Sequence, residues 1–152
     1  RRSRAVTAPR QARRPVTRAL PVVVDASMAV QWFANEPGSE TAVRLLERPA
    51  VLLAPDNMSA EAANAWWKKV RRGEMAASDL DEAVVNLLAI GIAWVPAAEL
   101  LPQASRLAVE IGHPVYDCLY LALAAERGAR LATADVPLRR LAFRMGIRLW
   151  RP

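Results

Sequence analysis

Short apolar runs alternate with longer segments of helical periodicity along most of the chain. The first run, Val22-Val23-Val24, follows Pro21 and ends at Asp25. A continuous apolar run of this length is typical of a strand that is buried on both faces. Strands that alternate with helices are joined by right-handed crossovers, which place helices on both faces of a parallel sheet. The pattern predicts an α/β fold of three layers, with a mostly parallel sheet of four or five strands.

The same periodicity gives the expected elements. Strands are predicted at residues 22–24, 51–54, 92–95, 131–133 and 147–150. Helices are predicted at about residues 27–34, 39–47, 59–72, 79–90, 98–110, 115–127 and 137–145. A single Gly follows most of these helices, which is typical of a helix that ends in a left-handed residue.

The basic residues are unevenly distributed. The 152 residues include 21 Lys and Arg against 15 Asp and Glu, and residues 1–21 contain seven of the Arg and no acid. Residues 22–152 therefore have 14 bases against 15 acids, a net charge of −1. Three Pro and the lack of any period predict a disordered Arg/Pro-rich arm at residues 1–21, followed by one domain at residues 22–152. The arm is open to three interpretations: a functional basic arm, a targeting peptide, or an artefact of the start site or of expression.

Composition excludes several kinds of protein. One Cys and one His exclude a disulfide framework and a zinc site made of Cys and His. No apolar run reaches the ~18 residues that a membrane span needs. We therefore expect a soluble protein of the cytoplasm. The six Gly are spread singly, which excludes a dinucleotide fingerprint and a P-loop.

Four acids occupy positions where ligands gather in open parallel sheets. Asp25 and Asp135 follow predicted strands, and such strand ends are the usual place of a ligand. Glu61 and Asp117 lie near the starts of helices that follow crossovers onto the same edge. Each acid taken alone has a simpler interpretation, as a helix cap or a solvated residue. Taken together, the four acids predict one cluster of carboxylates.

Converging carboxylates need a cation. Each pair repels by roughly 4 kcal/mol at about 4 Å and an effective dielectric constant of about 20. Oxygen ligands select hard ions such as Mg²⁺, which is normally shared with a substrate phosphate. The ion acidifies a water and neutralises the phosphoryl oxygens, so that no His base is needed. The lone His113, which precedes Pro114, is interpreted as a loop or capping residue.

Four sequence pieces occur in a characteristic order. They are Val24-Asp25-Ala26-Ser27 with Trp32 beyond it, Glu61-x-x-Asn64, Tyr116-Asp117-x-x-Tyr120-Leu121-Ala122-Leu123-Ala124, and Leu131-Ala132-Thr133-Ala134-Asp135. With these pieces the chain resembles the PIN-domain ribonucleases over about residues 22–150, in particular the VapC-type toxins of bacterial toxin–antitoxin pairs. The resemblance implies a PIN-like fold and a metal-dependent endoribonuclease. The product ends would be a 5′-phosphate and a 3′-hydroxyl.

The resemblance also implies roles for individual residues. Ser27 and Thr133 would be hydroxyl partners of the carboxylates, and Asn64 would support the site one helical turn from Glu61. Val136 stands where many relatives have a further polar or acidic residue, which leaves open whether one or two metal ions bind. The catalytic quartet around Mg²⁺ or Mn²⁺ would be Asp25, Glu61, Asp117 and Asp135.

Basic residues border this predicted site. Lys68 and Arg72 follow Glu61 on the same helical stripe and are predicted to bind RNA phosphates. The alternative is a solvated helix end whose cations favour the helix dipole. A second basic group, with the same alternative, consists of Arg139, Arg140, Arg144 and Arg148. The five Trp are interpreted as core or dimer contacts rather than as stacking platforms for bases.

Two partners besides RNA follow from the resemblance: a small antitoxin laid across the active-site edge and a second copy of the chain in a homodimer. Three other functions remain open. The first is a phosphotransferase or phosphatase with Asp25 as nucleophile. The second is a receiver-like phosphoacceptor, although no Lys occurs after Lys69. The third is a non-catalytic RNA-binding relative with the same fold. The identity of the RNA and of the antitoxin cannot be derived from the sequence.

Overall fold

The structure, a computed structural model, describes residues 20–48 and 50–152. The predicted arm therefore lies outside the described residues, except for Leu20 and Pro21. Pro21 is joined to the domain, since its carbonyl oxygen accepts a hydrogen bond from the Arg130 backbone N–H at 2.9 Å. None of the helices in these two ranges is both long enough and apolar enough to cross a bilayer.

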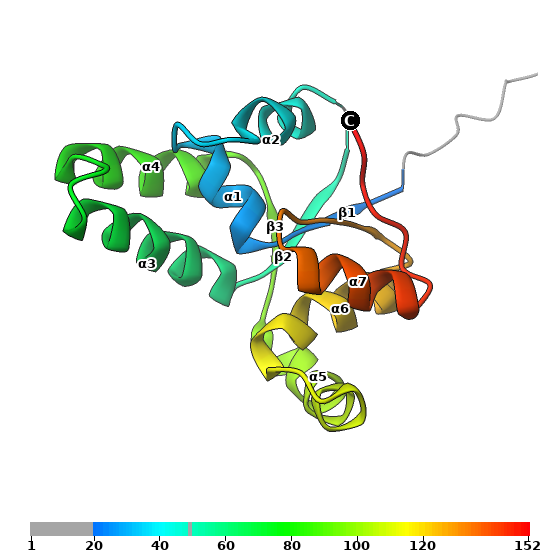
Figure 1. Cartoon of the computed structure of the whole chain (residues 1–152). Helices are drawn as coiled ribbons and strands as arrows, with labels where there is room; N and C mark the ends of the chain where they lie inside the picture. The colour runs from blue at the N-terminus through cyan, green and yellow to red at the C-terminus, as the bar shows by residue number, and fades with distance from the viewer. Residues whose placement is uncertain (1–19, 49) are drawn as a thin grey trace, which may run out of the picture.

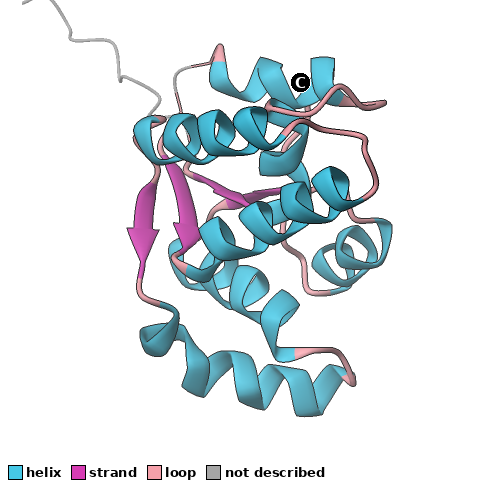
Figure 2. Cartoon of the chain, turned by 90° about the vertical axis from the view of Figure 1, so that its left-hand side faces the viewer, coloured by secondary structure: helices cyan, strands magenta, loops and turns pink. Residues whose placement is uncertain are grey.

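Four strands form one parallel sheet in the order β3-β2-β1-β4. The sheet lies between layers of helices, which confirms the predicted α/β fold (Figure 2). β1 is central and its three valines are fully buried, as its continuous apolar run predicts. The strands are β1 (Val22–Val24), β2 (Leu52–Pro55), β3 (Ala93–Val95) and β4 (Arg130–Ala132).

The fifth predicted strand, residues 147–150, is reduced to a single parallel bridge between Leu131 and Leu149. The reason is the shortness of β4. The Arg130 N–H and the Ala132 carbonyl bond to the β1 side, so that only Leu131 offers both backbone groups to the outer side. Leu131 uses them on the carbonyl of Arg148 and the N–H of Trp150.

Seven helices surround the sheet within the described ranges. They are α1 (Ala26–Trp32), α2 (Ser39–Leu46), α3 (Asn57–Arg71), α4 (Ala77–Ala89), α5 (Ala97–Ile111), α6 (Val115–Arg127) and α7 (Val136–Arg144). Figure 1 shows α1 and α2 on one side of the sheet and α5 and α6 on the other. Residues 118–124 of α6 are all buried, because α6 packs against both the sheet and α5. Gly112 and Gly128 end α5 and α6 with φ of 65° and 56°, as predicted.

The topology fixes where the functional side chains lie. β1 and β4 are neighbours, so the loops at their carboxyl ends lie side by side. Asp25 caps the start of α1 from one loop, and Asp135 caps the start of α7 from the other. α3 begins just after β2 and packs against α1, which brings Glu61 toward the same edge of the sheet.

Candidate active site

Asp25 is a buried carboxylate at the carboxyl end of β1, with 4% of the residue exposed. Its Oδ1 accepts hydrogen bonds from Ser27 Oγ at 2.7 Å and from the Met28 backbone N–H at 3.0 Å. Its Oδ2 accepts one from Thr133 Oγ1 at 2.5 Å. Burial raises the pKa of Asp25 to about 6, although these three donors lower it, and the charge of Asp135 adds to the rise.

Ser27 and Thr133 tie the two strand-end loops together. Ser27 Oγ accepts a hydrogen bond from the Ala134 N–H at 2.9 Å and lies 3.4 Å from Thr133 Oγ1. Thr133 Oγ1 also accepts one from the Asp135 N–H at 3.0 Å. The structure therefore places both predicted hydroxyl partners in contact with Asp25 and with the loop that carries Asp135. Asp135 itself caps α7 through a 2.7 Å bond from the Leu138 N–H.

Glu61 lies on α3 and is half-buried. Its Oε1 accepts hydrogen bonds from Asn57 Nδ2 and from Tyr120 Oη, the latter at 3.2 Å. Burial raises the pKa of Glu61, and the charges of Asp117 and Asp25 raise it further. Burial also raises the pKa of the Tyr120 hydroxyl, which keeps it a neutral donor.

Asn57 and Tyr120 were not predicted as site residues. Asn57 stands four residues before Glu61, a spacing that places two side chains on one helical face. Tyr120 has the one hydroxyl in the otherwise apolar stretch of α6 from Cys118 to Ala124. A polar atom in a stretch that must be buried needs a partner, so both residues had a signal in the sequence.

Asp117 contacts a histidine rather than the other three acids. Its Oδ2 lies 2.6 Å from His113 Nε2, in the loop before α6. Sequence reasoning gave His113 no place at the site. The four-residue spacing between the two side chains is the signal that could have linked them. Within the described ranges, Asp117 forms no hydrogen bond that links it to the other three acids, and its charge raises the pKa of Glu61.

A cavity of about 630 Å³ connects the acids to the basic end of α3. Glu61, Asp135 and Ser27 line it, as does Asn64. Lys68, Lys69 and Arg72 line its other part. Asp25 and Asp117 are not among its lining residues.

The three cations of this cavity differ in their partners. Lys69 Nζ pairs with Glu36, and Arg72 Nε lies 2.6 Å from Glu74 Oε1. Within residues 20–48 and 50–152, Lys68 forms no ion pair. Lys68 is therefore the cation of this group that is most available to a polyanion.

The acids fit a hard cation in chemistry but do not form a complete coordination sphere. Across the described ranges, no three His, Cys, Asp or Glu side chains lie close enough together to hold one ion. No ion pair there involves Asp25, Glu61 or Asp135, and the first two have raised pKa values because of burial and of neighbouring acids. A bound cation would offset the mutual repulsion of these carboxylates. Mg²⁺ uses only one or two carboxylates and keeps several waters, so a complete sphere of side chains is not required.

Comparisons with known proteins identify the family. The sequence profile of the PIN domain family matches residues 22–144. Ribonuclease VapC3 of Pyrobaculum aerophilum is 36% identical over 118 residues, which cover 75% of this chain and 88% of that protein.

Two crystal structures share the fold. VapC20 of Mycobacterium tuberculosis, described as a toxin that cleaves the sarcin–ricin loop, aligns with a TM-score of 0.64 and 21% identity over 86% of this chain and 99% of that one. PAE2754 of Pyrobaculum aerophilum aligns with a TM-score of 0.59 and 25% identity over 84% of this chain and 90% of that one. The predicted resemblance is confirmed, and the chain belongs to the PIN domain family as a member of the VapC type.

Proposed function

We propose that this chain is an endoribonuclease that hydrolyses RNA phosphodiesters with the help of Mg²⁺ or Mn²⁺, and that it is the toxin of a toxin–antitoxin pair. The observation that carries the proposal is the pair of carboxylates of Asp25 and Glu61. No basic side chain among the described residues neutralises either of them. The cavity beside them is lined by Lys and Arg in the part that lies away from the acids. Similarity to Ribonuclease VapC3 supports RNA as the substrate.

Asp25, Glu61, Asp117 and Asp135 would hold the metal. When bound, the metal supplies an activated water and neutralises the phosphoryl oxygens. The chain's own residues orient the acids: Ser27 and Thr133 hold Asp25 from two loops, and Tyr120 and Asn57 hold Glu61. This support costs no rearrangement when substrate binds, which is the advantage of a preorganised site.

The α3 part of the cavity is suited to the RNA backbone. Lys68 and Arg72 lie on the Glu61 stripe of α3 and line the same cavity as Glu61 and Asp135. RNA phosphates bound there would belong to the part of the substrate that extends away from the acids. Lys68 contributes more to RNA binding than Arg72, because the Arg72 guanidinium already donates to Glu74.

The two alternative activities fit the geometry less well. A phosphotransferase or phosphatase would need the phosphorus of its substrate to reach an Asp25 oxygen directly, but Asp25 is 4% exposed and does not line the cavity. A metal ion is far smaller than a phosphate ester and needs only the lone pair that Asp25 Oδ2 retains beside its single hydrogen bond. A non-catalytic RNA-binding PIN relative would not need the acids, and their charges in the cavity repel RNA unless a metal neutralises them.

We further propose that the protein acts in the cytoplasm as a homodimer and is inhibited by a cognate antitoxin. An antitoxin segment that covers the 630 Å³ cavity would block RNA. A basic antitoxin side chain placed among Asp135 and Glu61 would neutralise them in place of the metal.

The test is incubation of the purified protein with total RNA in Mg²⁺ or Mn²⁺, beside EDTA and an Asp117→Asn variant. We expect cleavage only by the wild type with metal. Undiminished cleavage in EDTA or by the variant would overturn the metal-dependent mechanism. Release of phosphate from a small monoester, without RNA cleavage, would favour the phosphatase.

A further inference from the structure

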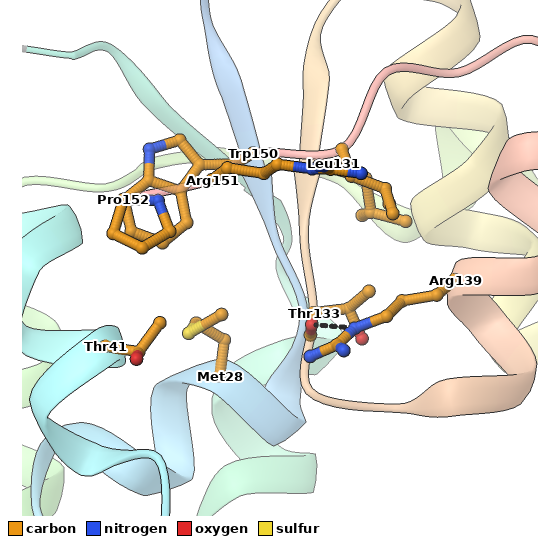
Figure 3. Close-up of a pocket in the computed structure, with 9 residues that line it drawn as sticks. Met28, Thr41, Leu131, Thr133, Arg139, Trp150, Arg151 and Pro152 are labelled. Carbon is orange, nitrogen blue, oxygen red and sulfur yellow. Dashed lines mark hydrogen bonds between the residues drawn. The ribbon is translucent and has the colours of Figure 1, made fainter.

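A second cavity, of about 400 Å³, lies beside the same two strand-end loops (Figure 3). We call it the Arg139 cavity. Its lining includes Met28, Thr41, Leu131, Thr133, Arg139 and Trp150, with Arg151 at the C-terminal side. Figure 3 shows Arg139 reaching in from α7 and Thr41 facing it from α2 across the opening. None of the four acids of the proposed active site lines it.

Two arginines, Arg139 and Arg151, line the cavity. Arg139 Nε donates to the Thr133 carbonyl oxygen at 3.0 Å, and the two terminal nitrogens of Arg139 have no hydrogen-bond partner among the described residues. Arg139 and Arg151 form no ion pair there, and no acidic side chain lines the cavity. A guanidinium with its two terminal nitrogens available matches the oxygens of a phosphate group.

The rest of the wall is apolar. Met28, Leu131 and Trp150 are buried residues that line the cavity, and Thr41 adds a hydroxyl at its edge. The volume lies within the range of about 300–1,000 Å³ that is usual for small-ligand sites. A ligand with an anionic group and a flat apolar part fits this combination, and a nucleotide is such a ligand.

Thr133 connects this cavity to the proposed active site. Its side chain lines the Arg139 cavity, and its Oγ1 donates to Asp25 at 2.5 Å. Met28 lines the cavity too, and its N–H donates to the other Asp25 oxygen. An occupant of the cavity would therefore contact two residues that directly hold Asp25.

We propose that the Arg139 cavity binds one nucleotide of the RNA substrate, near the bond to be cleaved, with its phosphate on Arg139 and its base against Met28 and Trp150. Single-stranded RNA can splay a base out of its stack into such a cavity. The inference rests on the proposed ribonuclease function and adds a subsite to it.

Three variants test the subsite. Arg139→Gln removes the cation, and Thr41→Glu places a negative charge on the opposite wall. Arg106→Gln is the matched control, an exposed Arg on α5 that does not line the cavity. The dissociation constant of a labelled dodecanucleotide RNA of random sequence is measured by fluorescence anisotropy in Mg²⁺, with Asp117→Asn in each chain to prevent cleavage. Without that change, kcat and KM are measured on total RNA.

We expect Arg139→Gln and Thr41→Glu each to weaken binding about tenfold and to raise KM similarly, with kcat almost unchanged. Arg139→Gln should also reduce the salt dependence of binding by about one counterion, as loss of one phosphate contact does. Arg106→Gln should change the dissociation constant less than twofold.

Other outcomes overturn the subsite. One is RNA affinity and KM like those of the wild type in both cavity variants. Another is a lower kcat in Arg139→Gln with unchanged affinity and an unaffected Thr41→Glu, since Arg139 would then only position Thr133. If Arg139→Gln does not fold, Thr41→Glu decides alone.

Two further measurements distinguish this inference from the proposed ribonuclease function and from the binding of free nucleotides. A wild type that cleaves no RNA, although Arg139→Gln still weakens RNA binding, would overturn the ribonuclease proposal but not the subsite. Uridine 5′-monophosphate is titrated by NMR as a free nucleotide. Binding of the monophosphate that Arg139→Gln abolishes, with RNA affinity unaffected, would overturn RNA as the occupant.

Discussion

His113 Nε2 lies 2.6 Å from Asp117 Oδ2, so the only histidine of the chain contacts one of the four acids proposed to hold the metal. The contact occupies one carboxylate oxygen and leaves the other available. Partners of this kind orient a ligating carboxylate, and their loss typically costs 10–100-fold in metal affinity.

We therefore expect His113→Ala to raise the Mg²⁺ concentration needed for half-maximal RNA cleavage by about tenfold. His113→Gln, which retains a donor, should restore part of the affinity. The measurement is a Mg²⁺ titration of the cleavage rate with each variant. An unchanged Mg²⁺ requirement in His113→Ala would show that the contact has no part in holding the metal.

A second prediction concerns Asp25 and pH. Its pKa is raised by burial to about 6 in the folded protein, above the ordinary value of 3.8, so the folded state binds a proton more tightly than the unfolded state. The free energy of unfolding should consequently fall as pH rises from about 4 to about 6, by about 3 kcal/mol in total from this group. Asp25→Asn should remove that part of the pH dependence.

Urea unfolding of wild type and Asp25→Asn in EDTA, at several pH values, isolates the effect, because other groups titrate alike in both. We expect the variant to be the more stable protein near pH 7 and the difference to vanish below about pH 4. Parallel stability curves for the two proteins would contradict a raised Asp25 pKa.

Asp135 combines a structural role with a chemical one, and two substitutions separate them. Asn is as good a helix cap as Asp, so Asp135→Asn should retain stability while it loses metal-dependent cleavage. Asp135→Ala also loses the bond to the Leu138 N–H and should be less stable by about 1 kcal/mol. Thermal unfolding and RNA cleavage are measured on both. A stable but fully active Asp135→Asn would remove Asp135 from the site.

The three cations along α3 should differ in RNA binding. We expect Lys68→Gln to weaken binding several-fold and to reduce the salt slope by about one, since Lys68 has no acidic partner among the described residues. Lys69→Gln and Arg72→Gln should have smaller effects, because these side chains already pair with Glu36 and Glu74. Equal losses in all three would contradict this ranking.

The four strands of the sheet could be predicted from the sequence, because each corresponds to a short local run of mainly apolar residues. Val22–Val24 is a continuous apolar run, and such a run has few alternatives to a central strand. The position of Asp25 and Asp135 followed from the topology, since the carboxyl ends of neighbouring parallel strands meet at one edge. The strand predicted at residues 147–150 is only a bridge at Leu149. Its extent could not be predicted, because it depends on which backbone groups of the short β4 remain unpaired.

The contacts of the site were harder to predict where a side chain has more than one possible partner. Asp117 lies in the first turn of α6, as predicted, but its Oδ2 contacts His113, which lies in the loop before that helix. Tyr120 reaches Glu61 only because α6 and α3 approach each other in space, whereas Asn57 lies one helical turn before Glu61 on α3 itself. Periodicity reports which face of a helix is buried, and it does not report what lies opposite that face.

The hydroxyl of Thr133 donates to Asp25 and accepts from the Asp135 N–H, across 108 residues of sequence in the first case. The substitutions that position 133 tolerates are consequently limited by two bonds at once, one to the distant Asp25 carboxylate and one from the nearby Asp135 backbone N–H. Serine retains the hydroxyl there, whereas valine, of nearly equal size, would release both loops. Variation between relatives at positions 27 and 133 is therefore expected to be correlated, because the loss of one hydroxyl leaves only the other hydroxyl and the Met28 N–H to hold Asp25.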